Sequence, residues 1–397
     1  MSKIKMLLVY ILLSVNISTV IADDNVLTVW EDKGKSLAIV NQIAEFEKNN
    51  NCIVKIFEKD AEKQLDLIMT NNGQTPDVFI LISDRLIDAY SNKVVREIDY
   101  SQEDRDLYET SALNALSVAN KVYAAPRSIE SLVIYYNKDL LEYPYETLEE
   151  YAEYSEKIKS KEKYGLLGNF QKFYYANSFI NAYGGYTFGK YKNKNINIFD
   201  IGLNNEGTIL GLKELKDFSQ RTMPKEALSK KADSVIDLMF TKGKAAAVIN
   251  GPIALKKYSK SGINFGIAPL PKLKNGKKLN GYYGVKGYAI SSKSRKHQLA
   301  EKFIRFINSP ENAQNRYFTN AELPPIKTLL EQSFISCDEL ANTIISQINE
   351  ASQMPNVHKM RIVWKTMDES LEKILSISNP NYKTVLNEAV SKIKQCD

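Results

Sequence analysis

The sequence contains few of the residues that carry out most hydrolytic and metal chemistry. Its 397 residues include two histidines, His297 and His358, and three cysteines. The chain has no G-x-S-x-G nucleophile motif, and His297 lies at the polar start of a predicted surface helix, where an exposed side chain is expected. Cysteines, histidines and carboxylates are nowhere grouped at metal-ligand spacing. We therefore expect neither a triad hydrolase nor a bound metal or other cofactor.

The three cysteines cannot all be paired within one chain. Cys337 and Cys396 can bridge the C-terminal segment if their Cα atoms lie close together. Cys52 begins an apolar stretch, where a buried free thiol is expected.

Proline and glycine are also scarce, with 12 and 18 residues, which excludes a collagen-like or disordered chain. The composition, 44% apolar and 25% charged, is typical of a soluble globular protein. At 397 residues the chain is longer than a single hydrophobic core usually supports, so two lobes are expected. No internal repeat is evident.

The chain has little excess charge of either sign, with a net charge of +6. Its basic clusters, residues 190–195 and 272–278, are interleaved with asparagine and glycine and are typical of solvated turns. They lack the aromatic platforms or helical stripe of a nucleic-acid site, so no nucleic-acid partner is expected. The stretch DKGKS at residues 32–36 is no phosphate-binding loop, because Val29 stands where that motif needs glycine.

The N-terminus carries the one long apolar run, residues 6–22, preceded by Lys3 and Lys5. Small residues at Val20 and Ala22 form a cleavage site, and polar interruptions favour a secretory signal over the alternative of an uncleaved anchor. No cysteine follows that would carry a lipid anchor. We predict cleavage after Ala22, which leaves a net charge of +4, and a periplasmic protein.

Predicted strands and helices alternate from residue 26 onward, and Ser36 is positioned to cap the first helix. The order is a strand at 26–30, a helix at 36–50, a strand at 52–57, a helix at 61–73 and a strand at 77–82. Continuously apolar strands in a β-α-β-α-β order predict a parallel sheet covered on both faces. Ligands of such sheets bind beyond the carboxyl ends of the strands.

Two polar elements stand out against this apolar pattern. Glu130 has no basic neighbour after Arg127, and a carboxylate is costly to bury unpaired, so it is either solvated or reserved for a ligand. Asp84 and Arg85 follow the third strand. Their plain interpretation is a helix cap with a local ion pair, and the alternative is a donor–acceptor pair for vicinal hydroxyls.

Five segments together resemble, in order and spacing, those of the maltose-binding-protein family, the extracellular sugar-binding components of ABC importers. They are TPDVFILISDR, SIESLVIYYNKDLL, NAYGGYTF, FTKGKAAAVINGPIAL and SQMPNVHKMRIVW. The similarity covers about residues 25–395, and YNKDLL and A-x-x-I-N-G-P are its most specific parts. It implies a two-lobed α/β fold, the type II periplasmic binding protein fold, with a mainly parallel sheet in each lobe and a ligand cleft between them.

The resemblance also implies that the chain crosses between the lobes more than once. It places residues 23–128 and 283–333 in an N-terminal lobe, residues 134–280 and 338–397 in a C-terminal lobe, and hinge crossings at 129–133, 281–282 and 334–337.

By the same matching, the family's sugar-binding positions fall in several of the quoted segments. A carboxylate, an acid–arginine pair, a polar pair and two aromatic walls have counterparts here. They are Glu130, the pair Asp84 and Arg85, the pair Asp32 and Lys33, and the aromatic residues Tyr174 and Trp364.

Three departures from the family bear on the ligand. Leu81 and Ile253 stand where the family has tryptophans, and Lys172 replaces an acidic residue. An aromatic contact is worth about 0.5–1.5 kcal/mol beyond burial, so two missing walls disfavour long maltodextrins. A maltose- or trehalose-like disaccharide or another small sugar is expected. Lys172 leaves a sugar phosphate, a glycerol phosphate or a polyol as the alternative.

The resemblance implies a monomeric binding protein without catalysis, which delivers its carbohydrate to the permease subunits of an ABC transporter. Two other hypotheses stay open on the sequence alone. One is a secreted glycosidase that uses Asp84 and Glu130 as its carboxylate pair. The other is an exported interaction scaffold whose cleft no longer binds a solute.

Overall fold

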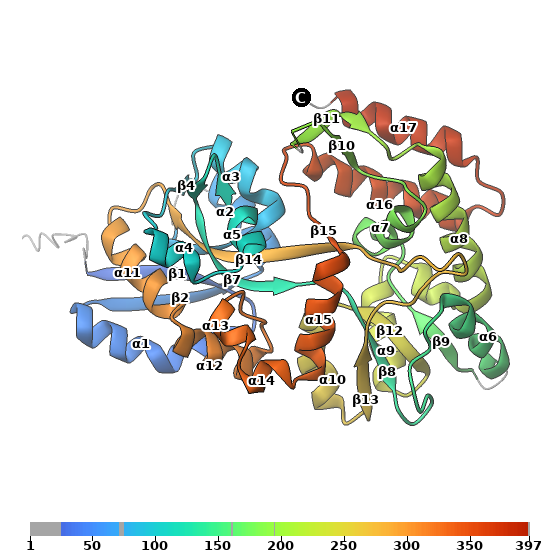
Figure 1. Cartoon of the computed structure of the whole chain (residues 1–397), viewed down its shortest axis with the longest axis horizontal. Helices are drawn as coiled ribbons and strands as arrows, with labels where there is room; N and C mark the ends of the chain where they lie inside the picture. The colour runs from blue at the N-terminus through green and yellow to red at the C-terminus, as the bar shows by residue number, and fades with distance from the viewer. Residues whose placement is uncertain (1–24, 71–74, 160–161, 194, 396–397) are drawn as a thin grey trace, which may run out of the picture.

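The computed structural model describes residues 25–70, 75–159, 162–193 and 195–395. The chain forms two lobes, each built around its own sheet (Figure 1). We call the part around the seven-stranded sheet the first lobe and the part around the four-stranded sheet the second lobe. The predicted signal sequence and Cys396 lie outside the described residues. Cys52 is a buried free thiol, as expected, and Cys337 is an exposed free thiol.

The first lobe contains the N-terminal third of the chain and a later segment, residues 282–336. Its elements are β1 (Val26–Asp32), α1 (Leu37–Asn50), β2 (Ile53–Lys59), α2 (Ala61–Thr70), β3 (Val78–Ile82), η1 (Ser83–Arg85), α3 (Leu86–Ser91), β4 (Val95–Arg96), α4 (Gln102–Asp106), α5 (Thr110–Ala115), β5 (Ser117–Val118), β6 (Lys121–Val122), β7 (Ala124–Glu130), β14 (Tyr282–Ser291), α11 (His297–Ile307), α12 (Pro310–Asn320), α13 (Lys327–Leu330) and α14 (Ser333–Ser336).

The second lobe takes the middle of the chain and its C-terminal helices. Its elements are β8 (Val133–Asn137), α6 (Leu148–Ile158), β9 (Tyr164–Leu167), α7 (Phe173–Ala182), β10 (Phe188–Lys190), β11 (Ile196–Ile201), α8 (Glu206–Thr222), η3 (Lys225–Leu228), α9 (Ala232–Thr241), β12 (Ala245–Asn250), η4 (Pro252–Ala254), α10 (Leu255–Ser261), β13 (Phe265–Ala268), α15 (Glu339–Glu350), β15 (Ser352–Gln353), α16 (Met360–Ser376) and α17 (Tyr382–Gln395).

The sheet of the first lobe has the order β15-β14-β3-β1-β2, with β4 and β7 also paired to β14. The edge strand β15 comes from the segment between α15 and α16 of the second lobe and pairs with the start of β14. Strand β1 is parallel to both β2 and β3, which confirms the β-α-β-α-β prediction. Strand β14 is antiparallel to β3 and β7. Figure 1 shows why: β7 runs toward the second lobe and β14 returns from it. The carboxyl ends of β1, β3 and β7 therefore face the second lobe.

The sheet of the second lobe, β13-β8-β12-β9, is not mainly parallel as expected. Strand β8 is antiparallel to both β12 and β13, and β12 and β9 are the parallel pair. The apolar run in β8 predicts a strand that is buried on both faces, and β8 is buried on both faces in the structure. Val133 and Tyr135 pack into one core cluster, and Ile134 and Tyr136 into the other. An apolar run reports burial on both faces and not strand direction.

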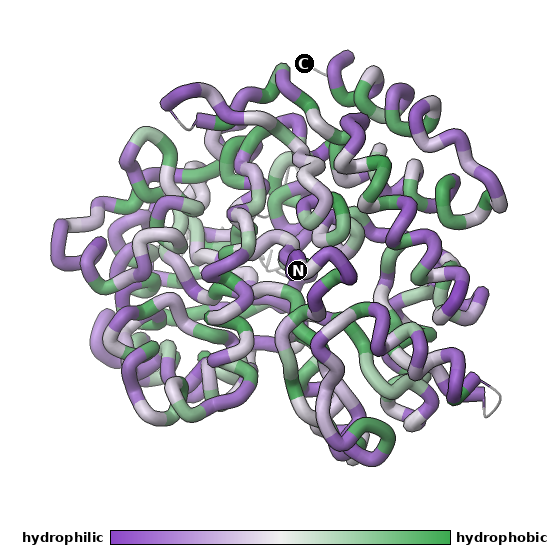
Figure 2. Tube along the Cα trace, turned by 45° about the vertical axis from the view of Figure 1, so that its right-hand side comes forward, coloured by the Kyte–Doolittle hydropathy of each residue, from purple (hydrophilic) through white to green (hydrophobic). Residues whose placement is uncertain are grey.

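Helices cover both sheets. In the first lobe α1 packs against α11 and α12, and α2 packs against β3. In the second lobe α16 packs against α17 and α7. Figure 2 shows hydrophilic and hydrophobic residues alternating along α17 near the C-terminus, as a helix with one buried face requires.

The start of α1 differs from the prediction. Ser36 occupies the N-cap position but makes no side-chain cap. Its hydroxyl instead donates to Glu58 Oε1 at 2.6 Å, and its backbone N–H donates to the same oxygen at 3.2 Å. Glu58 at the end of β2 therefore engages the hydroxyl that was expected to cap α1, and the first turn of the helix is bonded to backbone carbonyls of Lys35 and Ser36 instead.

A buried arginine joins the strand ends of the first lobe. The register of β7 on β14 passes from Ser128 opposite Lys286 to Pro126 opposite Gly287, so Arg127 is the extra residue of a β-bulge. A bulge redirects its side chain. The guanidinium of Arg127, 1% exposed, forms ion pairs with Glu31 on β1 and with Glu322 after α12, the latter at 2.8 Å.

Both carboxylates that pair with Arg127 have a further partner. Tyr288 Oη donates to Glu31 Oε2 at 2.9 Å, and Lys35 lies 3.6 Å from Glu322. Burial raises the pKa of Glu322, but Arg127, Lys35 and Lys286 outweigh it and lower the pKa from 4.5 to about 2. Glu322 thus stays ionised in the folded protein at pH values where the unfolded chain takes up a proton.

The difference between the pKa of Glu322 in the folded and in the unfolded protein predicts that the fold is sensitive to acid. The folded-state pKa of Glu322 is depressed, so its contribution is present above pH 4.5 and is lost as the pH falls from about 4.5 toward 2. A shift of this size corresponds to a few kcal/mol at about 1.4 kcal/mol per pH unit. Urea unfolding between pH 7 and 3 should show a steeper loss of unfolding free energy in the wild type than in Glu322→Gln. Equal acid slopes would contradict the assignment.

The close approach of β14 to β7 predicts a second effect. A Cβ added at Gly287 would meet Ala125 O at 2.9 Å and Ala124 Cβ at 3.0 Å. Backbone cannot easily move away, so Gly287→Ala should lower the unfolding free energy by about 1–3 kcal/mol in denaturant titration. Gly281→Ala is the matched control before the same strand, because its Cβ would meet nothing nearer than 3.7 Å. Equal stabilities of the two variants would contradict this packing.

Candidate functional site

Three charged side chains meet at the strand ends of the first lobe, facing the second lobe. Asp32 ends β1, Glu130 ends β7, and Lys286 on β14 lies between them. The Nζ atom of Lys286 is 3.3 Å from Asp32 Oδ2 and 3.7 Å from Glu130 Oε2. Because β7 and β14 are neighbours, Glu130 has the basic partner that its own segment lacks.

Lys286 remains an ammonium ion in this setting. Its side chain is 13% exposed, and burial alone would lower its pKa. The carboxylates of Glu130 and Asp32 outweigh burial and raise the pKa above its usual value. An ammonium has three N–H donors, so Lys286 can contact both carboxylates and still donate to a ligand oxygen.

The predicted polar pair Asp32 and Lys33 is divided by the structure. Asp32 Oδ1 accepts from the backbone N–H groups of Ala61 at 3.1 Å and of Lys33 at 2.9 Å, which fixes the carboxylate at the start of α2. The side chain of Lys33 is exposed, and within the described residues its ammonium has no hydrogen bond or ion pair. Asp32 belongs to the cluster of Glu130 and Lys286, and Lys33 lies outside it.

The pair Asp84 and Arg85 is also divided. Arg85 forms a local ion pair with Asp88 at 3.0 Å and a second with Asp66 at 2.8 Å, so its guanidinium is already engaged. Asp84 Oδ2 accepts from the indole N–H of Trp364 at 2.9 Å. Burial raises the pKa of Asp84, and the Trp364 and Arg85 contacts only partly oppose it. Asp84 therefore connects η1 of the first lobe to α16 of the second.

The two predicted aromatic walls lie side by side on the second lobe. The rings of Tyr174 on α7 and Trp364 on α16 have centroids 6.4 Å apart at 62°. Trp364 also packs against Phe173 at 5.5 Å and Tyr282 at 6.1 Å. Burial raises the pKa of Tyr174, with further contributions from Glu130 and Asp84 of the first lobe. The tyrosine hydroxyl thus stays neutral and lies within electrostatic range of both carboxylates.

Lys172 is paired with a carboxylate of its own lobe in this conformation. Its ammonium donates to Asp368 Oδ2 on α16 at 2.7 Å, and the neighbouring backbone N–H of Phe173 donates to Asp368 Oδ1 at 2.8 Å. This pair offsets the positive charge of Lys172, which is the feature that favours a phosphorylated ligand.

Leu81 and Ile253, which stand where the family has tryptophans, differ in their surroundings. Leu81 on β3 is 1% exposed and belongs to the core of the first lobe, so it presents no surface to a ligand. Ile253 in η4 is 64% exposed and lines a narrow cavity between the lobes, together with Glu130 and Lys286. The structure therefore brings Asp32, Glu130 and Ile253 to one place.

Sequence reasoning missed Lys286 and the buried ion pairs of Arg127. A signal for Lys286 was present, because it is the single charge within the apolar stretch GYYGVKGYAI. Its partners, however, come from strands far apart in the chain and are fixed by the sheet. The partners of Arg127, Glu31 and Glu322, are likewise distant in the sequence, so its own segment gives no sign of them.

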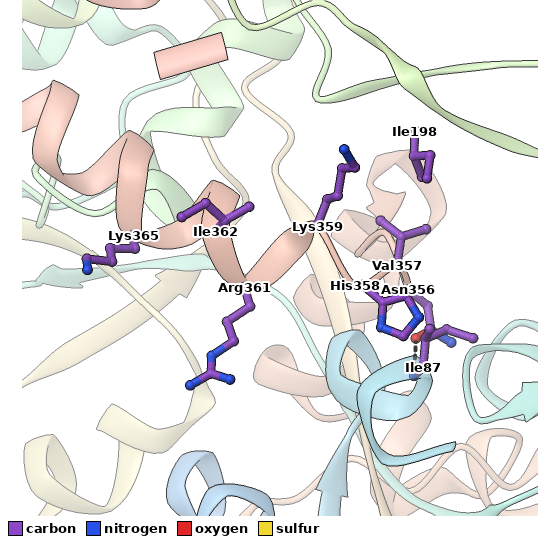
Figure 3. A pocket seen from close by; sticks show the side chains of 9 residues that line it. All are labelled: Ile87, Ile198, Asn356, Val357, His358, Lys359, Arg361, Ile362 and Lys365. Atoms are coloured by element: carbon purple, nitrogen blue, oxygen red, sulfur yellow. Dashed lines mark hydrogen bonds between the residues drawn. The ribbon is translucent and has the colours of Figure 1, made fainter. Parts of the chain in front are cut away.

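A larger cavity of about 660 Å³ lies between the lobes, and Arg361, Ile362 and Lys365 of α16 line one side of it (Figure 3). Ile87 of α3 and Ile198 of β11 line it from opposite lobes. Asn356 Oδ1 accepts from the Ile87 backbone N–H at 3.0 Å, drawn as a dashed line in Figure 3. His358 Nδ1 lies 3.1 Å from Asp88 Oδ1. These contacts hold the lobes together beside this cavity.

The arrangement suits a neutral ligand rich in hydroxyl groups. The first lobe offers carboxylate acceptors and an ammonium donor, and the second lobe offers aromatic faces. Within the described residues, no group of three or more histidines, cysteines and carboxylates is placed to hold a metal ion. In the same part of the chain, no helix has the length and apolarity needed to cross a bilayer.

Comparison with known proteins agrees with this architecture. Residues 41–343 match the family described as bacterial extracellular solute-binding protein. A galactooligosaccharide-binding protein of Bacillus subtilis is 34% identical, over 93% of this chain and 88% of that protein. The maltodextrin-binding protein MdxE of the same organism is 32% identical, over 93% and 89%.

The fold is shared with solved structures as well. MalX from Streptococcus pneumoniae, in complex with maltopentaose, superposes with a TM-score of 0.85 at 30% identity, covering 93% of this chain and 99% of MalX. The family match spans more than half of the chain, and the two curated relatives are both named as binding proteins. The chain thus belongs to the bacterial extracellular solute-binding proteins, with the two-lobed fold of the maltose-binding proteins.

Proposed function

We propose that this protein captures a neutral oligosaccharide between its two lobes and delivers it to the permease of an ABC transporter. The observation that carries the proposal is the cluster of Asp32, Glu130 and Lys286, which lies opposite Tyr174 and Ile253 of the second lobe. Hydroxyl groups would bind to the charged cluster, and the apolar faces of the sugar rings would pack on Tyr174 and Trp364.

The length of the ligand is inferred from the relatives. Missing tryptophans led us to expect a disaccharide, but the similar proteins are named for galactooligosaccharide and maltodextrin binding, and one solved neighbour holds maltopentaose. Leu81 lies in the core, so a tryptophan missing at this position does not remove a surface on which a sugar ring could stack in this conformation. We therefore favour an oligosaccharide.

The rival hypotheses are less well supported, because the similar proteins are named for binding neutral oligosaccharides and not for hydrolysis or for phosphorylated ligands. Lys172, on which the phosphorylated ligand depended, is bonded to Asp368. The two carboxylates of the glycosidase hypothesis have partners of their own, Trp364 for Asp84 and Lys286 for Glu130. A role in binding, without catalysis, is the proposal that agrees with these contacts.

Transport also requires export, a permease and a moving hinge. We propose cleavage after Ala22, a monomeric periplasmic protein, and lobes bounded as the family resemblance implies, with hinges at 129–133, 281–282 and 334–337. Closure about these crossings would bury the ligand.

The proposal predicts that Glu130→Ala lowers oligosaccharide affinity at least tenfold, because a hydrogen bond to a charged group is worth about 1.5–3 kcal/mol. Isothermal titration with malto- and galactooligosaccharides of two to six units measures the change. Glu97→Ala is the control, since Glu97 is a glutamate of the same lobe that is also paired with a lysine, Lys121 at 2.6 Å, but lies away from the proposed site. Wild-type affinity in Glu130→Ala would refute the site.

The two tryptophans allow an optical test. Trp30 is a buried core residue of the first lobe, whereas Trp364 lies at the proposed ligand surface. Adding the oligosaccharide should change the fluorescence of Trp30→Phe, in which Trp364 is the remaining tryptophan. The emission of Trp364→Phe should stay constant. A response carried by Trp30 alone would contradict the placement of Trp364.

A further inference from the structure

The narrow cavity beside Glu130 contains polar groups that the proposed function does not use. Lys35, Asn320 and Glu322 line it from the first lobe, and Pro252 and Ile253 close it from the second. Glu130 and Lys286 form its side nearest the charged cluster. The cavity is therefore an extension of the sugar site along the seam between the lobes.

One of these groups is a buried acceptor without a partner. Asn320 ends α12 and is 4% exposed. Its amide Nδ2 donates to the backbone carbonyl of Lys35 at 3.1 Å, but its Oδ1 has no hydrogen-bond partner in the described structure. A buried acceptor left unbonded costs about 1–3 kcal/mol, so such a group calls for an explanation. A ligand hydroxyl that donates to Oδ1 supplies one.

A donor accompanies this acceptor. The side chain of Lys35 is 12% exposed, and its ammonium donates to the backbone carbonyl of Asn320 at 3.2 Å and lies 3.6 Å from Glu322. Since an ammonium carries three N–H groups, one remains for an incoming oxygen. Asn320 and Lys35 both line the cavity, and between them they have an unbonded acceptor and a donor, the pair that a hydroxyl group requires.

The size of the cavity limits what can enter. About 20 Å³ is open to a water-sized group, which is enough for one water molecule or one hydroxyl-bearing substituent but not for a sugar ring. Pro252 and Ile253 line it from the opposite lobe, and a space of this size does not admit a further sugar unit.

We propose that this cavity is an end-group pocket, which binds a hydroxyl or hydroxymethyl group of the terminal unit of the oligosaccharide. Asn320 Oδ1 accepts a hydrogen bond from the hydroxyl group, and Lys35 Nζ donates one to the hydroxyl oxygen. The pocket is complete only in the closed arrangement of the lobes, because the second lobe contributes Pro252 and Ile253 to its lining. The inference rests on the proposed function and adds that the ligand is recognised by a free chain end.

The test is a double-mutant cycle between protein and ligand. The ligand is whichever linear malto- or galactooligosaccharide binds the wild type, together with its monodeoxy versions that each lack one hydroxyl of a terminal unit. Asn320→Ala should bind the parent sugar about three- to tenfold more weakly, as expected for one neutral hydrogen bond. For one monodeoxy sugar, wild type and Asn320→Ala should bind equally, because the same contact is missing in both.

The matched control is Asn312→Ala, on the same helix. Asn312 is 6% exposed and donates to the Phe306 carbonyl at 2.8 Å, away from the cavity. Its affinity should stay within twofold of the wild type. Asn320→Ser supplies the same measurement should Asn320→Ala fail to fold.

The outcomes separate the two proposals. If no oligosaccharide binds the wild type, the proposed function fails and the pocket with it. If sugars bind and Asn320→Ala matches the wild type, the function stands, and the cavity is a site for a buried water only. An Asn320→Ala loss that is the same for every monodeoxy sugar likewise overturns the pocket.

Discussion

The ion pairs of Arg127 are the constraint on which the first lobe depends. A single guanidinium connects the end of β1, the bulge of β7 and the turn after α12, three segments far apart in the chain. Removing one partner would leave a buried charge uncompensated, at a cost of about 3–5 kcal/mol, so these segments are held in one arrangement. The candidate site lies on the same two strands, since Asp32 follows Glu31 and Glu130 lies three residues after Arg127.

This arrangement gives the two lobes different chemistry. The first lobe presents charged groups whose positions are set by strand ends and by the buried network. The second lobe presents Tyr174 and Trp364 on packed helices, where their rings support each other. A sugar has hydroxyl groups at its edges and C–H groups on its faces, so it can satisfy both lobes at once. The hydrogen bond between Asp84 and Trp364 links the two kinds of surface directly.

Local features of the fold were predictable because they depend on neighbours in the sequence. The apolar strands at the N-terminus, the helices between them and their parallel pairing followed from hydrophobic periodicity. The antiparallel pairing of β8 with β12 and β13 did not, since an apolar run reports burial and not direction. The cap at Ser36 failed for a related reason, because a glutamate from another strand took its hydrogen bonds.

By itself the sequence determined the family and the fold class and proposed the residues of a candidate site, because motifs and apolar patterns can be recognised without knowledge of tertiary contacts. Only the tertiary structure decided which of those residues are available. Arg85 and Lys172 are engaged by Asp66, Asp88 and Asp368, and Leu81 is in the core. Lys286, by contrast, gains two carboxylate neighbours. Charge pairing and burial depend on groups that are distant along the chain, and no local pattern specifies them.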